Sequence, residues 1–457
     1  MNSTATQPVH LKLIAWVLIV PILYFAVHGM FSFDRSQYAN NAGIGVTSTV
    51  AVTAESDTLY YRLQRFAMYG IVAVAMTLSL RGTYRLAGRY PFLFSLPALA
   101  IFSTVWSQDK TKTLPLGVMV LCLTLFGVYL CYRFRGDEQL ELLNLVGIVA
   151  ALSSYFLVVF VPSAGIRHTD ASPAWQGLFV HKNALGVITV YFFAAAYYAE
   201  KRTALVSLFY KGYMGAMLVL VAMSLSRTAW LEMLLLLLYI AFEAIYLQAG
   251  RFERILLPAV IGLMAVAITI VAVTHTEQIS LALGKGTDMT GRSGIFEAIY
   301  PSLEKRPLTG FGYQAFWLGQ RGESANITMT PGHTALANAE NGPLQMWLEL
   351  GALGTGIIVI LLFQAVRSAI FGLKNSPTNF IRWNCSIVFL SLLMLINGDK
   401  FMYPDTIEWL VLVMAYVNLA EEARVTKQAF FAARTASVRL ASAPGPALQS
   451  EYRTTSP

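Results

Sequence analysis

Apolar runs of about twenty residues recur along nearly the whole chain, and they constrain its fold more than any other feature. A membrane-spanning α-helix needs about 20 mostly apolar residues, and a helix satisfies its own backbone hydrogen bonds inside lipid. The sequence therefore predicts an all-α polytopic membrane protein with about twelve transmembrane helices. The expected spans are residues 11–30, 66–81, 91–106, 114–132, 140–162, 178–198, 204–226, 228–248, 255–274, 343–366, 383–398 and 406–420.

Charged residues support this reading, since they make up only 13% of the 457 residues, against about 25% in soluble domains. The formal net charge of +8 would suggest nucleic acid in a soluble protein, but here the basic residues lie between apolar runs. We therefore expect no nucleic-acid partner. Cys122, Cys131 and Cys385 lie in or at the ends of apolar runs, which predicts neither a disulfide framework nor a metal site.

Basic residues follow every second predicted span, which is the pattern of cytoplasmic loops. Examples are Arg81 after the second span, Arg133 after the fourth and Arg251 after the eighth. An even number of spans then predicts a multi-pass protein of the cell inner membrane with both termini in the cytoplasm. The first span lacks a clear small-residue cleavage site, so we interpret it as a membrane helix, with a cleaved signal peptide as the alternative.

The chain is predicted to form a single transmembrane domain over residues 1–440. Residues 441–457 are rich in Ser, Ala and Pro, which predicts a disordered cytoplasmic tail. The largest predicted outer (periplasmic) loop spans residues 274–342. Apolar residues recur there at helical spacing, which predicts an amphipathic helix lying along the membrane surface. These residues are Ile295, Phe296, Ile299, Tyr300 and Leu303.

Several cations stand where the outer face should carry few of them. His181 and Lys182 begin the sixth span, where a cation opposes the helix dipole by roughly 0.3–1 kcal/mol unless an anion lies nearby. Arg227 lies between the seventh and eighth spans in apolar surroundings, and its planar fork suits phosphate oxygens. The alternatives are that Lys182 reaches lipid headgroups and that Arg227 pairs with an outer carboxylate.

Two further arginines frame the amphipathic helix. Arg292 opens it after a Gly-containing turn, and Arg306 follows its end, with ordinary attraction to lipid headgroups as the alternative for Arg306. We expect these five cations to bind a diphosphate: Arg227, Arg292, His181, Lys182 and Arg306. Asn183 either caps the sixth span or binds sugar.

The tenth span begins with Glu340-Asn341-Gly342-Pro343. Asn341 is expected to cap this helix, with Pro343 in its first turn. Glu340 is the first candidate for a general base, with helix capping as its alternative, and His333 is the second candidate base. Gly351, Gly354 and Gly356 are expected to allow close helix packing. No carboxylate cluster or phosphate-binding glycine loop is present, so we expect neither a metal nor a cofactor.

Several strings, taken in order, resemble the O-antigen ligase and polysaccharide polymerase superfamily over residues 100–400, with a ligase-like core at about 178–400. The first is Trp106-Ser107-Gln108-Asp109. The next is the Gly-Leu-Phe-Val-His-Lys-Asn-Ala-Leu-Gly string from Gly177 to Gly186, and Ser226-Arg227-Thr228 follows. Thr290-Gly291-Arg292 and the Arg-Pro-Leu-Thr-Gly-Phe-Gly-Tyr string from Arg306 to Tyr313 complete the set.

This resemblance implies an undecaprenyl-pyrophosphate-linked glycan as donor and a saccharide acceptor, either a growing glycan or lipid A-core. It further implies a metal- and nucleotide-independent transfer with inversion, in contact with membrane lipids and other polysaccharide-assembly membrane proteins. The pyrophosphate-binding arginines of the family correspond to Arg227 and Arg292. Its His-Asn, nine residues, Gly-x-x-Gly element aligns with Glu340, Asn341, Gly351 and Gly354.

Glu340 stands where the family has the histidine that serves as the base. Three alternatives remain: Glu340 takes that role, His333 substitutes for it, or the base contributes less than the cations do. The function indicated is an inner-membrane glycosyltransferase, either a surface polysaccharide polymerase or an O-antigen ligase. The alternative is a non-enzymatic transporter of lipid-linked oligosaccharide, but the two matched, broken helices of a transporter are not found in the sequence.

Overall fold

The computed structural model describes residues 9–28, 59–167, 173–250, 292–319, 321–328, 338–339, 341–397 and 402–442. The predicted span at 255–274 lies outside these residues, as do both candidate bases, His333 and Glu340, and the tail from residue 443.

Helices occupy each of the other predicted spans, so the helical fold class is confirmed. The long helices are α1 (Val9–Ala26), α4 (Leu59–Thr77), α7 (Lys110–Arg133), α8 (Asp137–Phe160), α10 (Lys182–Tyr198), α11 (Ala204–Met223), α12 (Arg227–Gln248), α17 (Gly342–Asn375), α18 (Asn379–Asn397) and α19 (Ile407–Ser442). Shorter helical pieces are α5 (Leu80–Ala87), η2 (Pro91–Phe94), α6 (Ser95–Phe102) and η3 (Ser103–Val105).

The count of twelve spans is not confirmed. Among the described residues, 5 helices are long and apolar enough to cross a membrane: α7, α8, α11, α12 and α17. A sixth is possible if α4 and α5, which meet at 93°, form one bent span. The helical residues 91–105 and 379–395 are apolar but too short to be counted as membrane spans.

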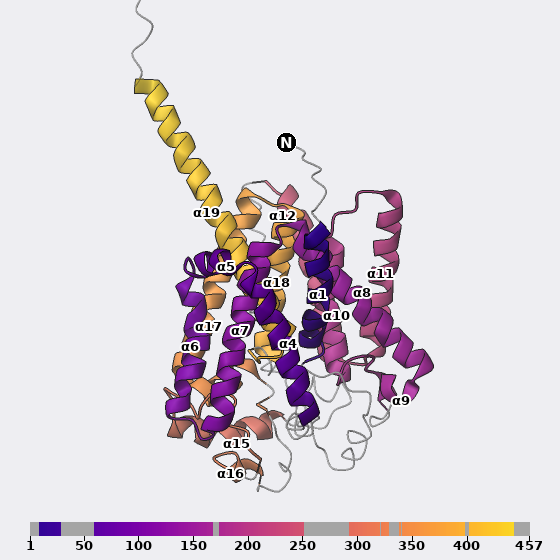
Figure 1. Ribbon diagram of the computed structural model, residues 1–457, viewed down its shortest axis with the longest axis vertical. Helices are drawn as coiled ribbons and strands as arrows, with labels where there is room; N and C mark the ends of the chain where they lie inside the picture. Colours follow the sequence, from indigo (N-terminus) through magenta and orange to yellow (C-terminus); the bar gives the residue numbers. More distant parts are fainter. Residues whose placement is uncertain are drawn as a thin grey trace, which may run out of the picture.

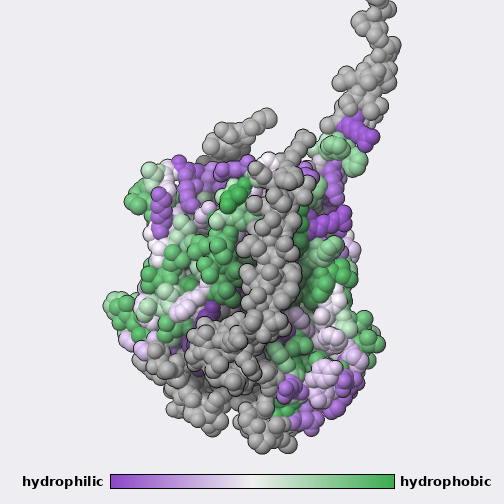
Figure 2. Space-filling view, turned by 180° about the vertical axis from the view of Figure 1, so that it is seen from behind, coloured by the Kyte–Doolittle hydropathy of each residue, from purple (hydrophilic) through white to green (hydrophobic). Residues whose placement is uncertain are grey.

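The helices run side by side and leave two distinct ends (Figure 1). At one end, here called the loop end, lie α9 (Pro162–Gly165), α15 (Arg292–Lys305) and α16 (Ala325–Thr328). At the opposite end, here called the tail end, lies α5, and the C-terminal part of α19 extends well beyond the body there. Figure 2 shows apolar side chains across the middle of one face and polar ones toward both ends, as expected for a protein that crosses a membrane.

The core is centred where α17, α18, α19, α7 and α10 pack together. Trp383 and Trp409 are fully buried there. The Trp409 indole Nε1 donates to the Thr124 hydroxyl at 2.9 Å, so this buried polar group is satisfied between two helices. A two-stranded antiparallel pair, β1 (Ile166–Arg167) and β2 (Ala174–Trp175), connects α9 to the loop before α10.

A second, smaller core lies at the loop end and holds α15 against α17. Helix α15 confirms the predicted helix in this region, with Ile299 fully buried and Tyr300 exposed. Phe311 and Phe316 are buried in the same cluster and meet edge to face. The segment after α15 is therefore ordered by its own aromatic side chains.

Candidate functional site

The starts of α10 and α12 lie against each other at the loop end. A Cβ atom added at Gly186 would lie 2.5 Å from the Ala229 Cβ atom and 2.8 Å from the Ser224 hydroxyl. Only glycine permits this approach, because any side chain would separate the two helices. The contact brings the first turns that carry Lys182 and Arg227 next to each other.

At each of the two helix starts, the side chain of the residue before the helix caps it. The Ser226 hydroxyl accepts from the Ala229 backbone N–H at the start of α12, as a Ser N-cap does. His181 caps α10 with its ring, where Nδ1 accepts from the Asn183 backbone N–H at 3.1 Å. His181 therefore serves as the N-cap of α10, and its contact with a diphosphate stays a prediction.

Arg227 is the first residue of α12 and its side chain is exposed. Within the described part of the chain, no carboxylate pairs with its guanidinium. Each helix N-terminus carries the equivalent of about half a positive charge. Two adjacent N-termini together with Lys182 and Arg227 form a positive region suited to a phosphate group.

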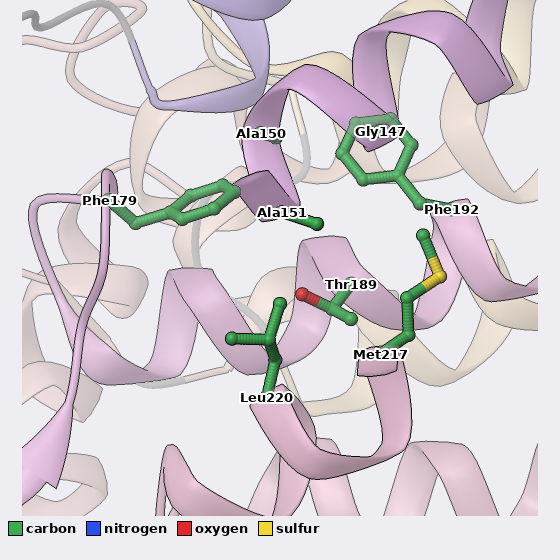
Figure 3. A pocket seen from close by; sticks show the side chains of 8 residues that line it. All are labelled: Gly147, Ala150, Ala151, Phe179, Thr189, Phe192, Met217 and Leu220. Atoms are coloured by element: carbon green, nitrogen blue, oxygen red, sulfur yellow. The ribbon is translucent and has the colours of Figure 1, made fainter. Parts of the chain in front are cut away.

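The loop that leads into α10 is held against Ser154 of α8. Gly177 has a positive φ of 55° and lies against Ser154, whose hydroxyl accepts from the Leu178 backbone N–H at 3.1 Å. Phe179 is buried and forms one wall of a cavity between α8, α10 and α11 (Figure 3). The Thr189 hydroxyl in that cavity donates to the Leu185 carbonyl. The lining of the cavity is therefore effectively apolar and provides no reactive group.

A break in α17 organises the other part of the loop end. Gly351 has φ 66° and ψ −167°, which interrupts the helix and frees backbone groups on either side. A Cβ atom at Gly351 would overlap the Leu308 carbonyl. The structure thus gives Gly351 a different role from close helix packing, since it lets another segment dock into the break. Among the described residues, nothing lies within 4 Å of a Cβ atom added at Gly356, so the expected close packing is not seen there.

The segment from Pro307 to Gly312 fills this break with backbone hydrogen bonds. Ala352 N–H donates to the Pro307 carbonyl at 2.8 Å, and Gly312 N–H donates to the Glu349 carbonyl at 2.9 Å. Gly310, with φ 64°, passes so close to Glu349 that a Cβ atom would lie 2.6 Å from its carbonyl. The glycines of the Arg306–Tyr313 string are therefore needed for docking.

Arg306 stands on the rim of this docked segment and is exposed. Its Nη1 donates to the Trp106 carbonyl at 3.1 Å, and its guanidinium lies 5.1 Å from the centre of the Phe311 ring. The Trp106 indole in turn donates to the Thr309 carbonyl at 3.0 Å. Arg306 is thus oriented without a carboxylate partner among the described residues.

The Ser107-Gln108-Asp109 string holds the same segment from the α7 side. Gln108 N–H donates to the Phe311 carbonyl at 3.1 Å, and its side-chain oxygen accepts from Glu323 N–H at 2.7 Å. Asp109 caps α7 by accepting from the Lys112 backbone N–H at 3.1 Å. The hydrogen bond from the Thr111 hydroxyl and that backbone bond lower the pKa of Asp109. The string therefore serves as a clamp for the loop.

Among the remaining predicted residues, Asn341 caps α17 as expected, with its side-chain oxygen accepting from Leu344 N–H at 3.1 Å. Arg292 is the first residue of α15, as predicted. Asn183 lies in the first turn of α10 and is exposed. An added Cβ at Gly354 would meet the Leu350 side chain of its own helix. Helix α18 packs against α10, α12 and α17.

Buried carboxylates inside apolar helices were missed by the sequence reasoning. Glu232 in α12 and Glu349 in α17 are 0% and 4% exposed. The Glu349 carboxylate accepts from the Gln314 backbone N–H and from the Gln345 side chain. An ionisable residue within an apolar run was the available signal, because such residues are costly in a membrane and mark functional positions.

Comparison with protein families gives one finding that bears on this geometry. Residues 212–378 match the family model described as O-antigen ligase. The matched segment includes the start of α12 with Arg227, helix α15, the docked segment after Arg306 and the break in α17. The resemblance seen in the motifs is thereby confirmed for this segment. No curated protein matches the chain.

Proposed function

We propose that the chain transfers glycan from an undecaprenyl-pyrophosphate donor to a saccharide hydroxyl, because residues 212–378 match the family model described as O-antigen ligase and several helices are long and apolar enough to cross a membrane. The reaction takes place at the periplasmic face of the inner membrane, and the loop end faces that side. The acceptor is a growing glycan in a polymerase or lipid A-core in a ligase.

The observation that carries this proposal is the pairing of two helix starts that bear Lys182 and Arg227, within or beside the matched domain. Negative charge develops on the diphosphate as its bond to the sugar breaks. Aligned helix N-termini and a guanidinium therefore stabilise the transition state more than the bound donor. We propose that Arg292, the first residue of α15, and Arg306, which follows its end, also bind the donor. Ligand binding of this kind needs exposed cations, and Arg227 and Arg306 are exposed.

The chemistry is a direct displacement at the anomeric carbon. The acceptor oxygen forms a bond to that carbon while the bond to the pyrophosphate oxygen breaks, which inverts the configuration. Glu340 accepts the acceptor's proton, with His333 as the alternative base. The leaving diphosphate carries away the electron pair and is held by the cations, so the step requires neither metal nor nucleotide.

The test is transfer by the purified protein in detergent with lipid-linked repeat units, without ATP or added metal. Elongated lipid-linked glycan supports polymerase activity, and glycan on added lipid A-core supports ligase activity. Unchanged substrate with both acceptors, in a sample that is folded by thermal unfolding, would overturn the proposal.

A further inference from the structure

Helix α19 continues well past the body of the bundle at the tail end and leans to one side as it leaves (Figure 1). Its exit is fixed at Glu421, whose Oε1 accepts from Arg89 Nη1 at 3.0 Å and from the Tyr90 hydroxyl at 2.8 Å. The Glu421 Oε2 accepts from Arg424 Nη2 at 2.6 Å, one turn further along. Contacts with the residues between α5 and η2 therefore set the direction in which α19 leaves the bundle.

The part of α19 beyond this exit, residues 423–442, is here called the emerging segment. It has no carboxylate and four cations, which are Arg424, Lys427, Arg434 and Arg439. At 3.6 residues per turn, Lys427 and Arg434 share one face of the helix with Phe430 and Phe431, here called the aromatic pair. The rings of the pair are 65% and 62% exposed and meet edge to face at 6.1 Å. One face thus presents two charges and two aromatic rings.

The end of α17 indicates the level at which this face lies relative to lipid. Ile370 is 59% exposed, and the exposed Lys374 follows one turn later, so the apolar zone of α17 ends between them. At that level, the Lys427 Nζ lies 5.4 Å from the centre of the Phe371 ring. The aromatic pair is one turn further along α19, ~5 Å, which is within the thickness of a lipid headgroup region.

Cations mixed with aromatic rings on one face suit lipid headgroups better than an apolar protein groove. A groove that enclosed the rings would also remove water from Lys427 and Arg434, which is costly without carboxylate partners. At a membrane surface, the rings enter the acyl boundary while the long basic side chains reach the phosphates.

We propose that the emerging segment binds anionic lipid headgroups at the tail end through Lys427, Arg434 and the aromatic pair. This binding is independent of the transfer reaction proposed above. It adds a lipid contact outside the bundle, on the side opposite the candidate site.

The test is hydrogen–deuterium exchange of the backbone amides of the emerging segment in the full-length protein. The protein is reconstituted in nanodiscs of phosphatidylcholine alone or of equal parts phosphatidylcholine and anionic phosphatidylglycerol. A helix that projects into water without partners opens readily, so its amides exchange quickly. We expect phosphatidylglycerol to slow the exchange by about ten-fold or more, the factor that two cations near an anionic surface provide. High salt should remove most of the slowing, because counterions screen exposed charges.

The charge part of the proposal is tested by Lys427→Gln combined with Arg434→Gln. This double variant should lose the slowing in phosphatidylglycerol. Glutamine forms helix about as well as lysine and arginine, so the loss would not come from a weaker helix. The matched control is Lys110→Gln combined with Arg321→Gln, which removes two exposed cations at the loop end and should keep the slowing.

The aromatic part is tested by Phe430→Ala combined with Phe431→Ala, which should also lose most of the slowing. Alanine forms helix better than phenylalanine, so an effect on the helix alone would change the exchange in the opposite direction. Val425→Ala is the control, since Val425 lies on the opposite side of the helix and is 52% exposed.

Equal exchange in the two lipid mixtures, slowing that persists in either double variant, or slowing that salt does not affect would overturn the inference. Slowing that depends on protein concentration instead of lipid composition would indicate a second copy of the chain as the partner, and it would overturn the inference as well.

Discussion

The two ends of the helix bundle use the same residue types differently. At the tail end, Arg382 Nη2 lies 2.9 Å from Glu243 Oε2, and the Tyr198 hydroxyl donates to the same carboxylate at 2.8 Å. At the loop end, Arg227 has no carboxylate partner among the described residues, and Arg306 contacts a carbonyl group and an aromatic ring.

The loop end is not without ion pairs, since Lys305 pairs with Glu323 there. The difference concerns which arginines are paired. Glu243 is 1% exposed, so the pair with Arg382 fixes α12 against α18 in the folded protein. Arg227 is exposed at the start of the same α12, where its charge is available to a ligand. One helix therefore carries a folding contact at one end and a candidate binding group at the other.

The largest effect on stability is expected at the tail end. Arg382→Met should lower the free energy of unfolding by about 3–5 kcal/mol, because it leaves the Glu243 carboxylate buried without its ion-pair partner. Thermal unfolding in detergent measures this loss. The double variant with Glu243→Met should recover much of it, and an unchanged unfolding temperature in Arg382→Met would contradict the contrast between the ends.

The largest effect on activity is expected at the loop end. Arg227→Ala should lower the transfer rate by about a hundred-fold or more, the size seen when a group that stabilises a developing oxyanion is removed. Its unfolding temperature should not change. Arg227→Lys should keep part of the rate, since lysine retains the charge without the planar fork.

The control for this variant is Arg202→Ala, which removes an exposed pair with Glu200. An exposed pair contributes little to stability, and this one lies in the connection between α10 and α11, away from the loop end. Equal transfer rates in Arg227→Ala and Arg202→Ala would remove the assignment of Arg227 to the donor.

The break in α17 offers a further test of the comparison between the two ends, because it lies at the loop end. Gly351→Ala should destabilise the protein by about 1–2 kcal/mol or more, from the cost of a positive φ alone, and should displace the docked Pro307–Gly312 segment. Gly356→Ala on the same helix meets no described neighbour within 4 Å and should be neutral or slightly stabilising. Unfolding temperatures and transfer rates of the two variants, measured together, test this; similar values would contradict the role of the break.

The smallest expected effect is at Asp109. Its pKa is lowered in the folded protein, so its stabilising contribution is present above the unfolded value of about 3.9 and is lost as the pH falls through the folded value. Asp109→Ala should cost about 1 kcal/mol at neutral pH through loss of the α7 cap. The measurement is the unfolding temperature of Asp109→Ala and of the unaltered protein at pH 7 and near pH 3. A difference between the two proteins that does not become smaller at low pH would contradict the expected pH dependence.

Much of the helical framework follows from local sequence. Helices begin at Lys182, Arg227 and Arg292, as predicted from where polar residues interrupt apolar runs. The expected cap at Asn341 is also found. The 93° bend between α4 and α5 was not predicted, because the apolar content of residues 66–81 does not report how the chain turns.

The candidate site was predicted in its parts but not in its connections. Lys182 was singled out because a cation at a helix start opposes the helix dipole, and Arg227 because it lies between two spans in apolar surroundings. Their adjacency depends on Gly186 contacting Ala229, which no local pattern reports. Glu349 was overlooked, because its hydrogen bond with the Gln314 backbone joins two segments that are far apart in the sequence.

By itself, the sequence determined that this chain is a bundle of apolar helices with cations at selected helix starts, because hydrophobic length and helix dipoles are properties of single segments. Only the tertiary structure decided which helix starts meet, that Gly351 opens α17 to a distant segment, and that Glu349 accepts a hydrogen bond from the Gln314 backbone. Those features arise from contacts between residues far apart in the chain, whose energies depend on distance and burial in the folded protein.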